Sequence, residues 1–404
     1  MKDDGPGPSR ERLSEPGLRS LFWIFFKIAC TSFGGFMAMI AVVQNVVVER
    51  RKLLSSADMA DGISLASILP GPVAVNLVAY VGYRLRGAAG AAVSAIAIVL
   101  PSLTLILLLS VAYFRYGQVP AVSRLFLGFI PAMTAIILAA AWNMARKSVT
   151  NLREAILVVT GAVVLLVAGG VWSTLGIVLG AGVLGSWWFR ERSGPADSPP
   201  APAVPVPPRP GDSKLHAVLP FVSTAAPLLS VDPGLLAKIF FTFGGMSLML
   251  FGGAYVFIPL IQEVVVEGHG WVSQQEFIDA VAMGQVTPGP ILVSAAFVGL
   301  KIAGLAGALA ATLGIYLPSA LLMIASSRVL EHIKRSAVIR SALRGVRPAV
   351  VGMIFAAGVV IGKTAAPVWV SVAIFAVSLL ALLRFRIEAV WIIPAAGGFG
   401  WLFY

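Results

Sequence analysis

The chain has 404 residues, of which 58% are hydrophobic and 12% charged, and its mean hydropathy is +0.91. Because soluble proteins have about a quarter of their residues charged, this composition excludes the soluble class and predicts an all-α polytopic membrane protein. The net charge of +12 comes from Lys and Arg residues at the ends of apolar segments, which indicates membrane topology and not nucleic-acid binding. The single cysteine, Cys30, excludes an intramolecular disulfide framework.

The first twenty residues are polar and rich in proline and glycine, which predicts a cytoplasmic tail at 1–20 and no signal peptide. The apolar segment at 21–48 is interrupted by Phe33-Gly34-Gly35. Each of its two arms has about 13 residues, fewer than the ~20 that cross hydrocarbon. Lys27, in the first arm, is expected either to contact an anion or to snorkel to the surface.

The next segment, 55–86, contains Pro70-Gly71-Pro72 at its centre. Each proline removes an amide donor and glycine permits almost any dihedral, so the helix must break there. Broken backbone at membrane depth is tolerated only where it is buried in protein or lines a watery cavity. The triplet therefore predicts a binding site, preceded by a half-helix that starts at a Ser55-x-x-Asp58 capping box.

Four longer apolar segments complete the first transmembrane repeat, predicted over 21–192: 88–113, 124–145, 154–169 and 172–189. A proline-dense stretch then predicts a semi-rigid linker at 193–232. The second transmembrane repeat is predicted over 233–404, with apolar segments at 235–262, 274–300, 303–327, 346–363, 367–383 and 388–404.

The second repeat copies the first. Pro288-Gly289-Pro290 follows Pro70-Gly71-Pro72 by 288 − 70 = 218 positions, and Gly252-Gly253 follows Gly34-Gly35 at the same offset. Past the triplet the offset becomes 217, as for the pair Pro101-Ser102 and Pro318-Ser319. Such duplication is how many secondary transporters are built, with the broken helices of both copies meeting at the bilayer midplane.

If the two interrupted segments of the first copy are re-entrant hairpins, or pairs of half-helices that return to one side, positive charge predicts that the second copy is inserted upside down. The basic run Arg50-Arg51-Lys52 is replaced in the second copy by Glu267-Gly268-His269-Gly270, whereas basic residues crowd the loop near Arg335, whose first-copy counterpart is nearly neutral. Inversion requires one extra crossing between the copies, for which 217–231 is the candidate.

The strings FFKIACTSFGG and ILPGP in the first copy, with LFGGAYVFIPL and VTPGP in the second, resemble the chromate ion transporter (CHR) family. The resemblance implies a multi-pass protein of the cytoplasmic membrane that exports chromate and confers chromate resistance. It also implies sulfate as a look-alike substrate, antiport or coupling to the membrane potential or proton gradient, and halves of opposite orientation. Two departures are Leu53, where the second copy has Trp271, and Lys27, whose counterpart is Gly245.

Chromate and sulfate are tetrahedral dianions, and free backbone amides at half-helix N-termini can bind them without a buried positive charge. The predicted substrate-binding residues lie at or beside the breaks: Lys27, Gly34, Gly35, Pro70, Gly71, Pro72, Val73, Asn76, Gly252, Gly253, Thr287, Pro288, Gly289, Pro290 and Ile291.

Two further matched pairs are gating or coupling candidates. Arg84 and Lys301 are expected to mark the mouths of the path or to anchor the topology. Asp61 and Asp279 are expected to carry a coupling proton or to stabilise helix N-termini.

Alternatives remain open at this point. The substrate can be another anion, such as sulfate, molybdate or a small organic acid, and a passive channel would differ by non-saturating flux. An intramembrane enzyme would need paired carboxylates, a Ser/His couple or metal ligands at membrane depth, which are not found; neither a metal nor a cofactor is expected. Small residues such as Gly87 and Ala91 leave room for helix packing within one chain or in a homodimer.

Overall fold

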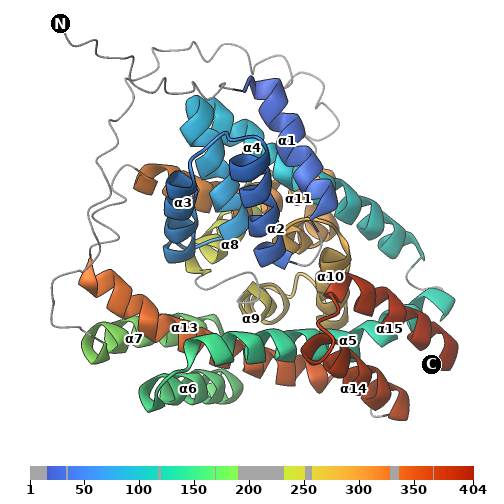
Figure 1. The fold of residues 1–404 in the computed structure, drawn as a ribbon. Helices are drawn as coiled ribbons and strands as arrows, with labels where there is room; N and C mark the ends of the chain where they lie inside the picture. The colour runs from blue at the N-terminus through green and yellow to red at the C-terminus, as the bar shows by residue number, and fades with distance from the viewer. Residues whose placement is uncertain are drawn as a thin grey trace, which may run out of the picture.

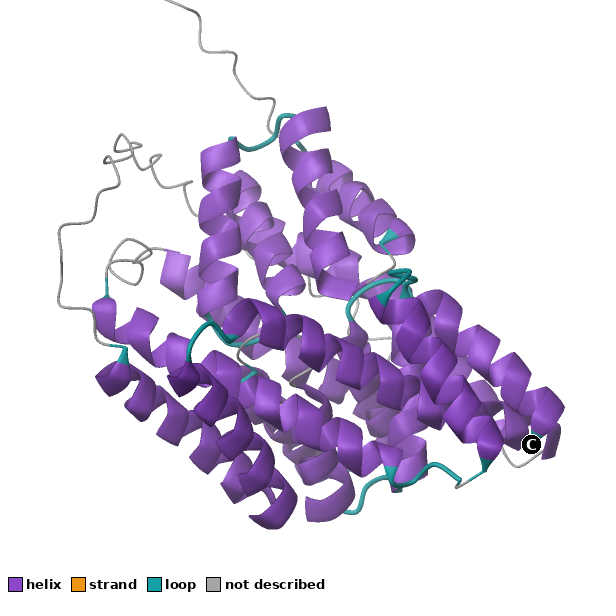
Figure 2. Cartoon of the chain, turned by 60° about the horizontal axis from the view of Figure 1, so that its bottom comes forward, coloured by secondary structure: helices purple, strands orange, loops and turns teal. Residues whose placement is uncertain are grey.

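The computed structural model describes residues 16–32, 35–116, 120–168, 170–189, 232–250, 257–327, 336–366 and 368–404. Over these residues every regular element is a helix, which confirms the all-α class (Figures 1 and 2). Within the same ranges four helical stretches are long and apolar enough to cross a membrane: Val73–Tyr116, Arg124–Arg146, Ile291–Ser327 and Ser341–Gly362. The predicted crossing at 217–231 lies outside the described residues.

The same order of elements occurs twice. The first copy has α1 (Leu18–Thr31), α2 (Gly35–Gln44), a π-helix (Asn45–Arg50), α3 (Ser56–Ile68), α4 (Val73–Tyr116), α5 (Pro120–Ser148), α6 (Leu152–Ala168) and α7 (Gly170–Trp188). The second has α8 (Pro233–Met249), α9 (Phe257–Ile261), a π-helix (Gln262–Gly268), α10 (Gln274–Val286), a 3₁₀ turn (Ile291–Val293), α11 (Ser294–Ser327), α13 (Ala337–Gly362), α14 (Trp369–Leu383) and α15 (Ala389–Phe403).

Helix α4 is two arms joined at a sharp turn. Arg86 leaves the helical region and Gly87 has φ +61°, a conformation that favours glycine. Residues eight apart in a straight helix are separated by about 12 Å. A Cβ on either Gly82 or Gly90 would nevertheless overlap the carbonyl oxygen of the other. The chain therefore folds back on itself, and only glycine fits at the closest approach.

Helix α11 repeats this turn in the second copy. Gly304 has φ +58°, and Gly299 and Gly307 approach each other as closely as their counterparts do. The ion pair between Arg84 and Asp58 places the start of α3 beside the end of the first arm of α4. Together α3 and that arm form a helical hairpin with Pro70-Gly71-Pro72 at its tip.

The helices are arranged in two layers. Helices α1–α4 and α8–α11 lie mostly in the upper part of Figure 1, and α5–α7 with α13–α15 form the lower layer. In the lower layer α13 packs against α6 and α7 of the other copy, and α5 packs against α14 and α15. A Cβ on Gly128 would overlap Ala396 O, and one on Gly352 would overlap Val158 O. Glycines thus bring the backbones of the two copies together, and the lower helices of neither copy form a complete layer alone.

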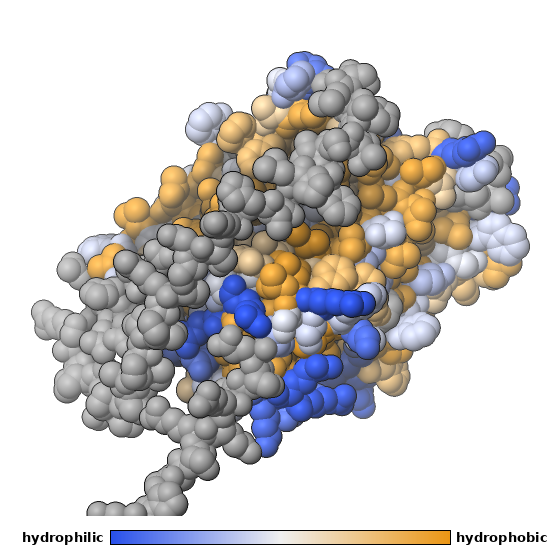
Figure 3. Space-filling model, turned by 90° about the horizontal axis from the view of Figure 1, so that it is seen from above, coloured by the Kyte–Doolittle hydropathy of each residue, from blue (hydrophilic) through white to orange (hydrophobic). Residues whose placement is uncertain are grey.

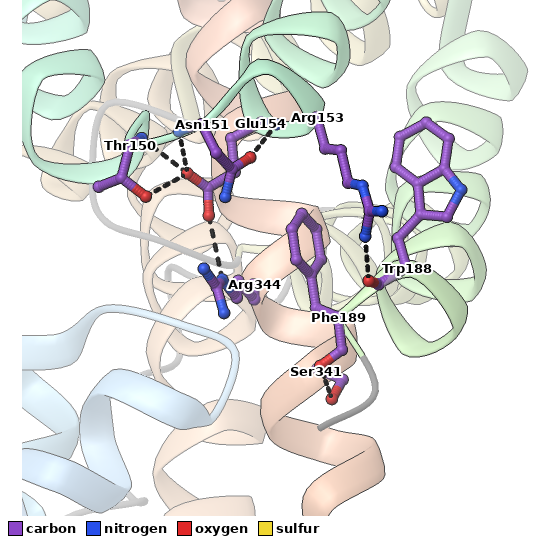
Figure 4. A network of polar contacts seen from close by, with 8 residues as sticks. All are labelled: Thr150, Asn151, Arg153, Glu154, Trp188, Phe189, Ser341 and Arg344. Atoms are coloured by element: carbon purple, nitrogen blue, oxygen red, sulfur yellow. Dashed lines mark hydrogen bonds and ion pairs between the residues drawn. The ribbon is translucent and has the colours of Figure 1, made fainter. Parts of the chain in front are cut away.

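A polar network fixes one of these crossings (Figure 4). The carboxylate of Glu154 on α6 accepts hydrogen bonds from the Thr150 and Asn151 amides and from Arg344 Nε on α13, the last at 3.0 Å. The Arg344 guanidinium also lies 4.8 Å from the centre of the Phe189 ring. The network therefore joins the first copy to the second at a side chain, Glu154, that is only 4% exposed.

This network explains one difference from the sequence prediction. The apolar segment was expected to begin at 346, whereas α13 begins at Ala337 with Ser336 as its N-cap. The first turns of α13 contain arginines, which lower the local hydropathy, so a prediction from hydropathy starts the segment too late. Arg344 is accommodated because its guanidinium donates a hydrogen bond to the Glu154 carboxylate and lies over the face of the Phe189 ring.

The outer surface suits lipid contact. Seen from above, hydrophobic side chains cover much of both flanks, and the largest group of hydrophilic side chains lies in the lower middle of the view (Figure 3). Large apolar side chains such as Trp172, Trp187 and Trp391 are exposed on the lower-layer helices. In water such a surface would be an aggregation hazard, whereas in a bilayer it is the expected lipid-facing surface.

Candidate functional site

Both Pro-Gly-Pro triplets break the helices as predicted. Helix α3 ends at Ile68 and α4 begins at Val73, and α10 ends at Val286 before the 3₁₀ turn. The central glycines have φ +105° at Gly71 and +119° at Gly289, which L-residues with a side chain rarely adopt. Pro70 and Pro290 are buried in protein. The broken backbone is therefore sheltered from lipid, as membrane depth requires.

Each break is tied to the opposite copy through its glycine amide. Gly71 N donates to Leu250 O at 2.8 Å, and Gly289 N donates to Ser32 O at 3.1 Å. Leu250 is the counterpart of Ser32, since 250 − 32 = 218. These two amides hold the breaks against the ends of α8 and α1. They have protein acceptors and are thus not among the free amides expected to face an anion.

The same glycines lie close to the other copy, at the long arm that follows the sharp turn of α4 or α11. A Cβ on Gly71 would overlap Ser319 Cβ on α11, and one on Gly289 would lie 3.0 Å from Ser102 Oγ on α4. In the sequence, the repeated Pro-Ser pair is used only to align the two copies. The contacts of Ser102 and Ser319 with the glycines of the breaks were not predicted. The signal was present, because both serines follow a proline at the offset of the duplication.

The two breaks converge on one face of α11. Ser319 lies against Gly71, and Tyr316, one turn earlier, donates its hydroxyl to Pro290 O at 3.4 Å. The side chain of Tyr316 is buried. One helical turn of α11 therefore contacts both triplets.

Several buried polar atoms in the described part of the chain lack protein partners, and some of them belong to residues at or beside the breaks. Among the described residues, the buried side-chain atoms that lack a hydrogen-bond partner include Ser32 Oγ, Asn76 Oδ1, Gln262 Oε1 and Gln285 Nε2. Asn76 Nδ2 donates to Pro70 O, and Ser32 adjoins Gly289 through its carbonyl. Because an unpaired buried polar group costs about 1–3 kcal/mol, these atoms mark a region suited to a polar ligand or to water.

The structure gives less information on the other predicted site residues. Val73 and Ile291 begin the elements that follow the breaks and are buried. Thr287 Oγ1 donates to Gly284 O, so its hydroxyl is engaged within its own turn. Gly35 is the first residue of α2, whereas Gly34, Gly252 and Gly253 lie outside the described residues.

Lys27 is exposed on α1, whose buried face consists of Leu21, Ile24, Phe25, Ile28 and Ala29. The exposure favours the snorkelling alternative over contact with an anion.

The gating candidates form two equivalent ion pairs. Arg84 Nη2 lies 2.6 Å from Asp58 Oδ1, and Lys301 Nζ lies 2.6 Å from Glu276 Oε1. Both acids belong to the Ser-x-x-acid caps: Ser55 Oγ accepts from Asp58 N, and Ser273 and Glu276 form a complete capping box. Each pair therefore fastens the start of a half-helix to the arm that returns beside it.

The loop before the second capping box carries little positive charge. The His269 ring stacks on Trp271 with centres 4.4 Å apart, and Lys238 Nζ lies 5.9 Å from the Trp271 ring. Burial, assisted by the Lys238 charge, lowers the pKa of His269 below its usual value. The lowered pKa favours the neutral imidazole.

The matched carboxylates differ in environment. Asp279 is 1% exposed, whereas Asp61 is partly exposed. Asp279 accepts hydrogen bonds from Tyr113 Oη and Gln275 Nε2, both at 2.9 Å. The described residues contain no group of three or more side chains suited to a metal ion.

Two intertwined helical copies, each with a helical hairpin that ends in a largely buried Pro-Gly-Pro, fit a multi-pass membrane protein. The sequence matches the chromate transporter family over residues 19–186 and 237–401, one stretch in each copy. The chain therefore belongs to the chromate transporter family, whose members are transporters and not enzymes.

Individual relatives agree with this assignment. The chromate transport protein of Cupriavidus metallidurans is 30% identical over 86% of this chain and 83% of its own length. The probable chromate transport protein of Synechococcus elongatus is 28% identical over 86% of this chain and 85% of its own length. The uncharacterized transporter YwrA of Bacillus subtilis is 33% identical over 41% of this chain and 94% of its own length, which amounts to a single copy. No solved structure matches the chain.

Proposed function

We propose that this protein is a secondary transporter that exports chromate from the cytoplasm and binds the dianion where the two Pro-Gly-Pro breaks converge. The observation that carries the proposal is the single turn of α11 whose Ser319 and Tyr316 contact the two breaks. Two breaks held together in this way form one site shared by both copies, which suits alternating access around a fixed midplane position.

The chemistry of this region suits an anion more than a cation. Helix α4 begins at Val73 directly after the first break, and after the second break a 3₁₀ turn leads into α11 at Ser294; the N-terminus of an α-helix carries about half a positive elementary charge. The hydroxyl of Ser32 and the amide nitrogen of Gln285 are donors without protein acceptors within the described residues. No carboxylate belongs to either triplet. Several such donors would offset the desolvation of a dianion.

The identity of the anion rests on family membership and on the names of the relatives. Sulfate has nearly the same charge and shape as chromate, and an amide cradle reads only those properties. Sulfate is therefore the second candidate substrate. Opposite orientation of the two copies in the cytoplasmic membrane, supported by the reversed positive-charge bias, would make the shared site reachable from either side in turn.

The test is uptake of labelled chromate into inverted membrane vesicles, with sulfate and molybdate as competitors and with or without an uncoupler. We expect saturable uptake that the uncoupler abolishes. Sulfate competition more effective than unlabelled chromate would reassign the substrate. Uptake that neither saturates nor exchanges with internal chromate would instead indicate a channel.

A further inference from the structure

The most deeply buried carboxylate among the described residues is Asp279, on α10 of the second copy. Its side chain is 1% exposed, and its two oxygens accept hydrogen bonds from neutral donors only, Tyr113 Oη and Gln275 Nε2. A buried carboxylate without a cation beside it is expensive in hydrocarbon and marks a functional position. The ion pair of Lys301 with Glu276 leaves Lys301 engaged elsewhere.

The environment of Asp279 is specific to one copy, although the acid itself is duplicated. Asp61 is its counterpart at 279 − 218 = 61. The position equivalent to Gln275 is Ala57, and the position equivalent to Tyr113 is Leu330, since 113 + 217 = 330. Neither side chain can donate a hydrogen bond. The sequence therefore repeats the acid but not this pair of donors. A helix-capping role shared by both copies would not explain why the donors occur in one copy only.

The donor from the other copy is held firmly in place. Tyr113 lies near the end of the long arm of α4, and its ring packs edge-on against Phe126 of α5 at 4.9 Å and Phe297 of α11 at 5.3 Å between centres. The hydroxyl position thus depends on α4 and α5 of the first copy and on α11 of the second. Any shift of α4 away from α10 lengthens the bond from Tyr113 to Asp279.

Ionisable groups other than Asp279 lie on α10 and on several elements packed against it. On α10 itself, Glu276 precedes Asp279 by three residues, and its carboxylate is paired with Lys301 of α11. The turn Ile291–Val293 and helix α15 (Ala389–Phe403), which pack against α10, contain no ionisable side chain. Helix α5, also packed against α10, carries Arg124, Arg146 and Lys147, and the second π-helix carries Glu263 and Glu267. The second arm of α4 carries Arg115 and Tyr116 just after Tyr113.

We propose that Asp279 is the proton-binding group of the transporter and that Tyr113 makes its proton affinity depend on how the two copies are arranged. With the Tyr113 hydrogen bond in place the carboxylate is stabilised. When the copies move apart at this point, Asp279 loses a donor and takes a proton from water. Re-formation of the bond releases the proton to water. Only O–H bonds are made and broken, and one proton is carried per cycle. The role of this proton in coupled export rests on the proposed function.

Proton binding can be measured without any substrate. We expect pH-difference infrared spectra of the purified full chain to contain a carboxylic-acid carbonyl component that Asp279→Asn removes and Asp61→Asn retains. Tyr113→Phe removes one donor to the carboxylate and should move the midpoint of that component to higher pH by about one to two units. A component that survives in Asp279→Asn, or an unshifted midpoint in Tyr113→Phe, would overturn the assignment.

A second measurement links the proton to transport. In proteoliposomes that hold a pH-sensitive dye, the wild type should move protons in proportion to chromate, and Asp279→Asn should give no dye signal per chromate moved. A full dye signal in this variant would contradict the proposal. A wild type that moves no chromate would contradict the proposed function instead, and the infrared titration would still decide on Asp279.

Discussion

The amide of Gly71 donates a 2.8 Å hydrogen bond to the carbonyl of Leu250, and 218 residues further on the amide of Gly289 donates a 3.1 Å bond to the carbonyl of Ser32. Each bond crosses from one copy to the other. The tip of each hairpin is therefore positioned by the residue that caps α8 or α1 of the other copy. A binding site between the tips can exist only when both copies are folded and packed together.

The first prediction concerns Gly71→Ala. Alanine at φ +105° is strained, and its Cβ would overlap Ser319 Cβ. We expect chromate transport to fall at least tenfold and the protein in detergent to lose about 1–3 kcal/mol of stability. Gly245→Ala is the matched control, because its Cβ would meet nothing within 4 Å. Equal transport by the two variants would show that the close approach at Gly71 does not matter.

The second prediction is a rescue by Ser319→Gly. Removing the serine side chain relieves the overlap with the alanine introduced at position 71 in the double variant but not the backbone strain. Partial recovery of the thermal midpoint in detergent is therefore expected when Ser319→Gly is added to Gly71→Ala. The same background with Ser110→Gly, a buried serine on α4, serves as control. If the losses of thermal midpoint in the two single variants simply add in the double variant, the two residues do not interact.

The third prediction concerns the contact between Glu154 and Arg344. Glu154→Ala leaves the Thr150 and Asn151 amides and Arg344 without their acceptor. We expect a loss of about 1–3 kcal/mol, less than for a fully buried pair because the Arg344 side chain is 43% exposed. Thermal unfolding in detergent measures this loss. Glu388→Gln, at an exposed N-cap without a side-chain bond, should leave stability unchanged.

The fourth prediction concerns the orientation of the copies. Ser55 and Ser273 are equivalent, exposed residues before α3 and α10. In a Cys30→Ser background, which removes the exposed native thiol, Ser55→Cys and Ser273→Cys should react with an impermeant thiol reagent from opposite sides of the membrane. Labelling of both from the same side in intact cells would refute the inverted arrangement.

Much of the local structure was predictable because it depends on short-range chemistry. The prolines and glycine of each triplet end a helix whatever surrounds them, and Ser273 with Glu276 starts one. Apolar length predicted the membrane class, and the fixed offsets predicted two copies. The start of α13 was misplaced because arginine reads as polar until its partner, Glu154, is known.

The site was predicted only in part, for a related reason. The sequence indicates that Gly71 and Gly289 are special, yet it does not indicate that their amides are already engaged by Leu250 and Ser32. Nor does it distinguish Asp279 from Asp61, since the decisive donor, Tyr113, lies 166 positions away in the other copy.

By itself the sequence determined where the helices break, how many times the unit occurs and that the molecule belongs in a bilayer, because backbone sterics and apolar length act within one segment. Only the tertiary structure decided that the copies interlock, that one turn of α11 contacts both breaks, and that Asp279 has hydrogen-bond donors from two helices. Those features depend on distances between remote segments, which are set by close packing of whole helices and not by any local pattern.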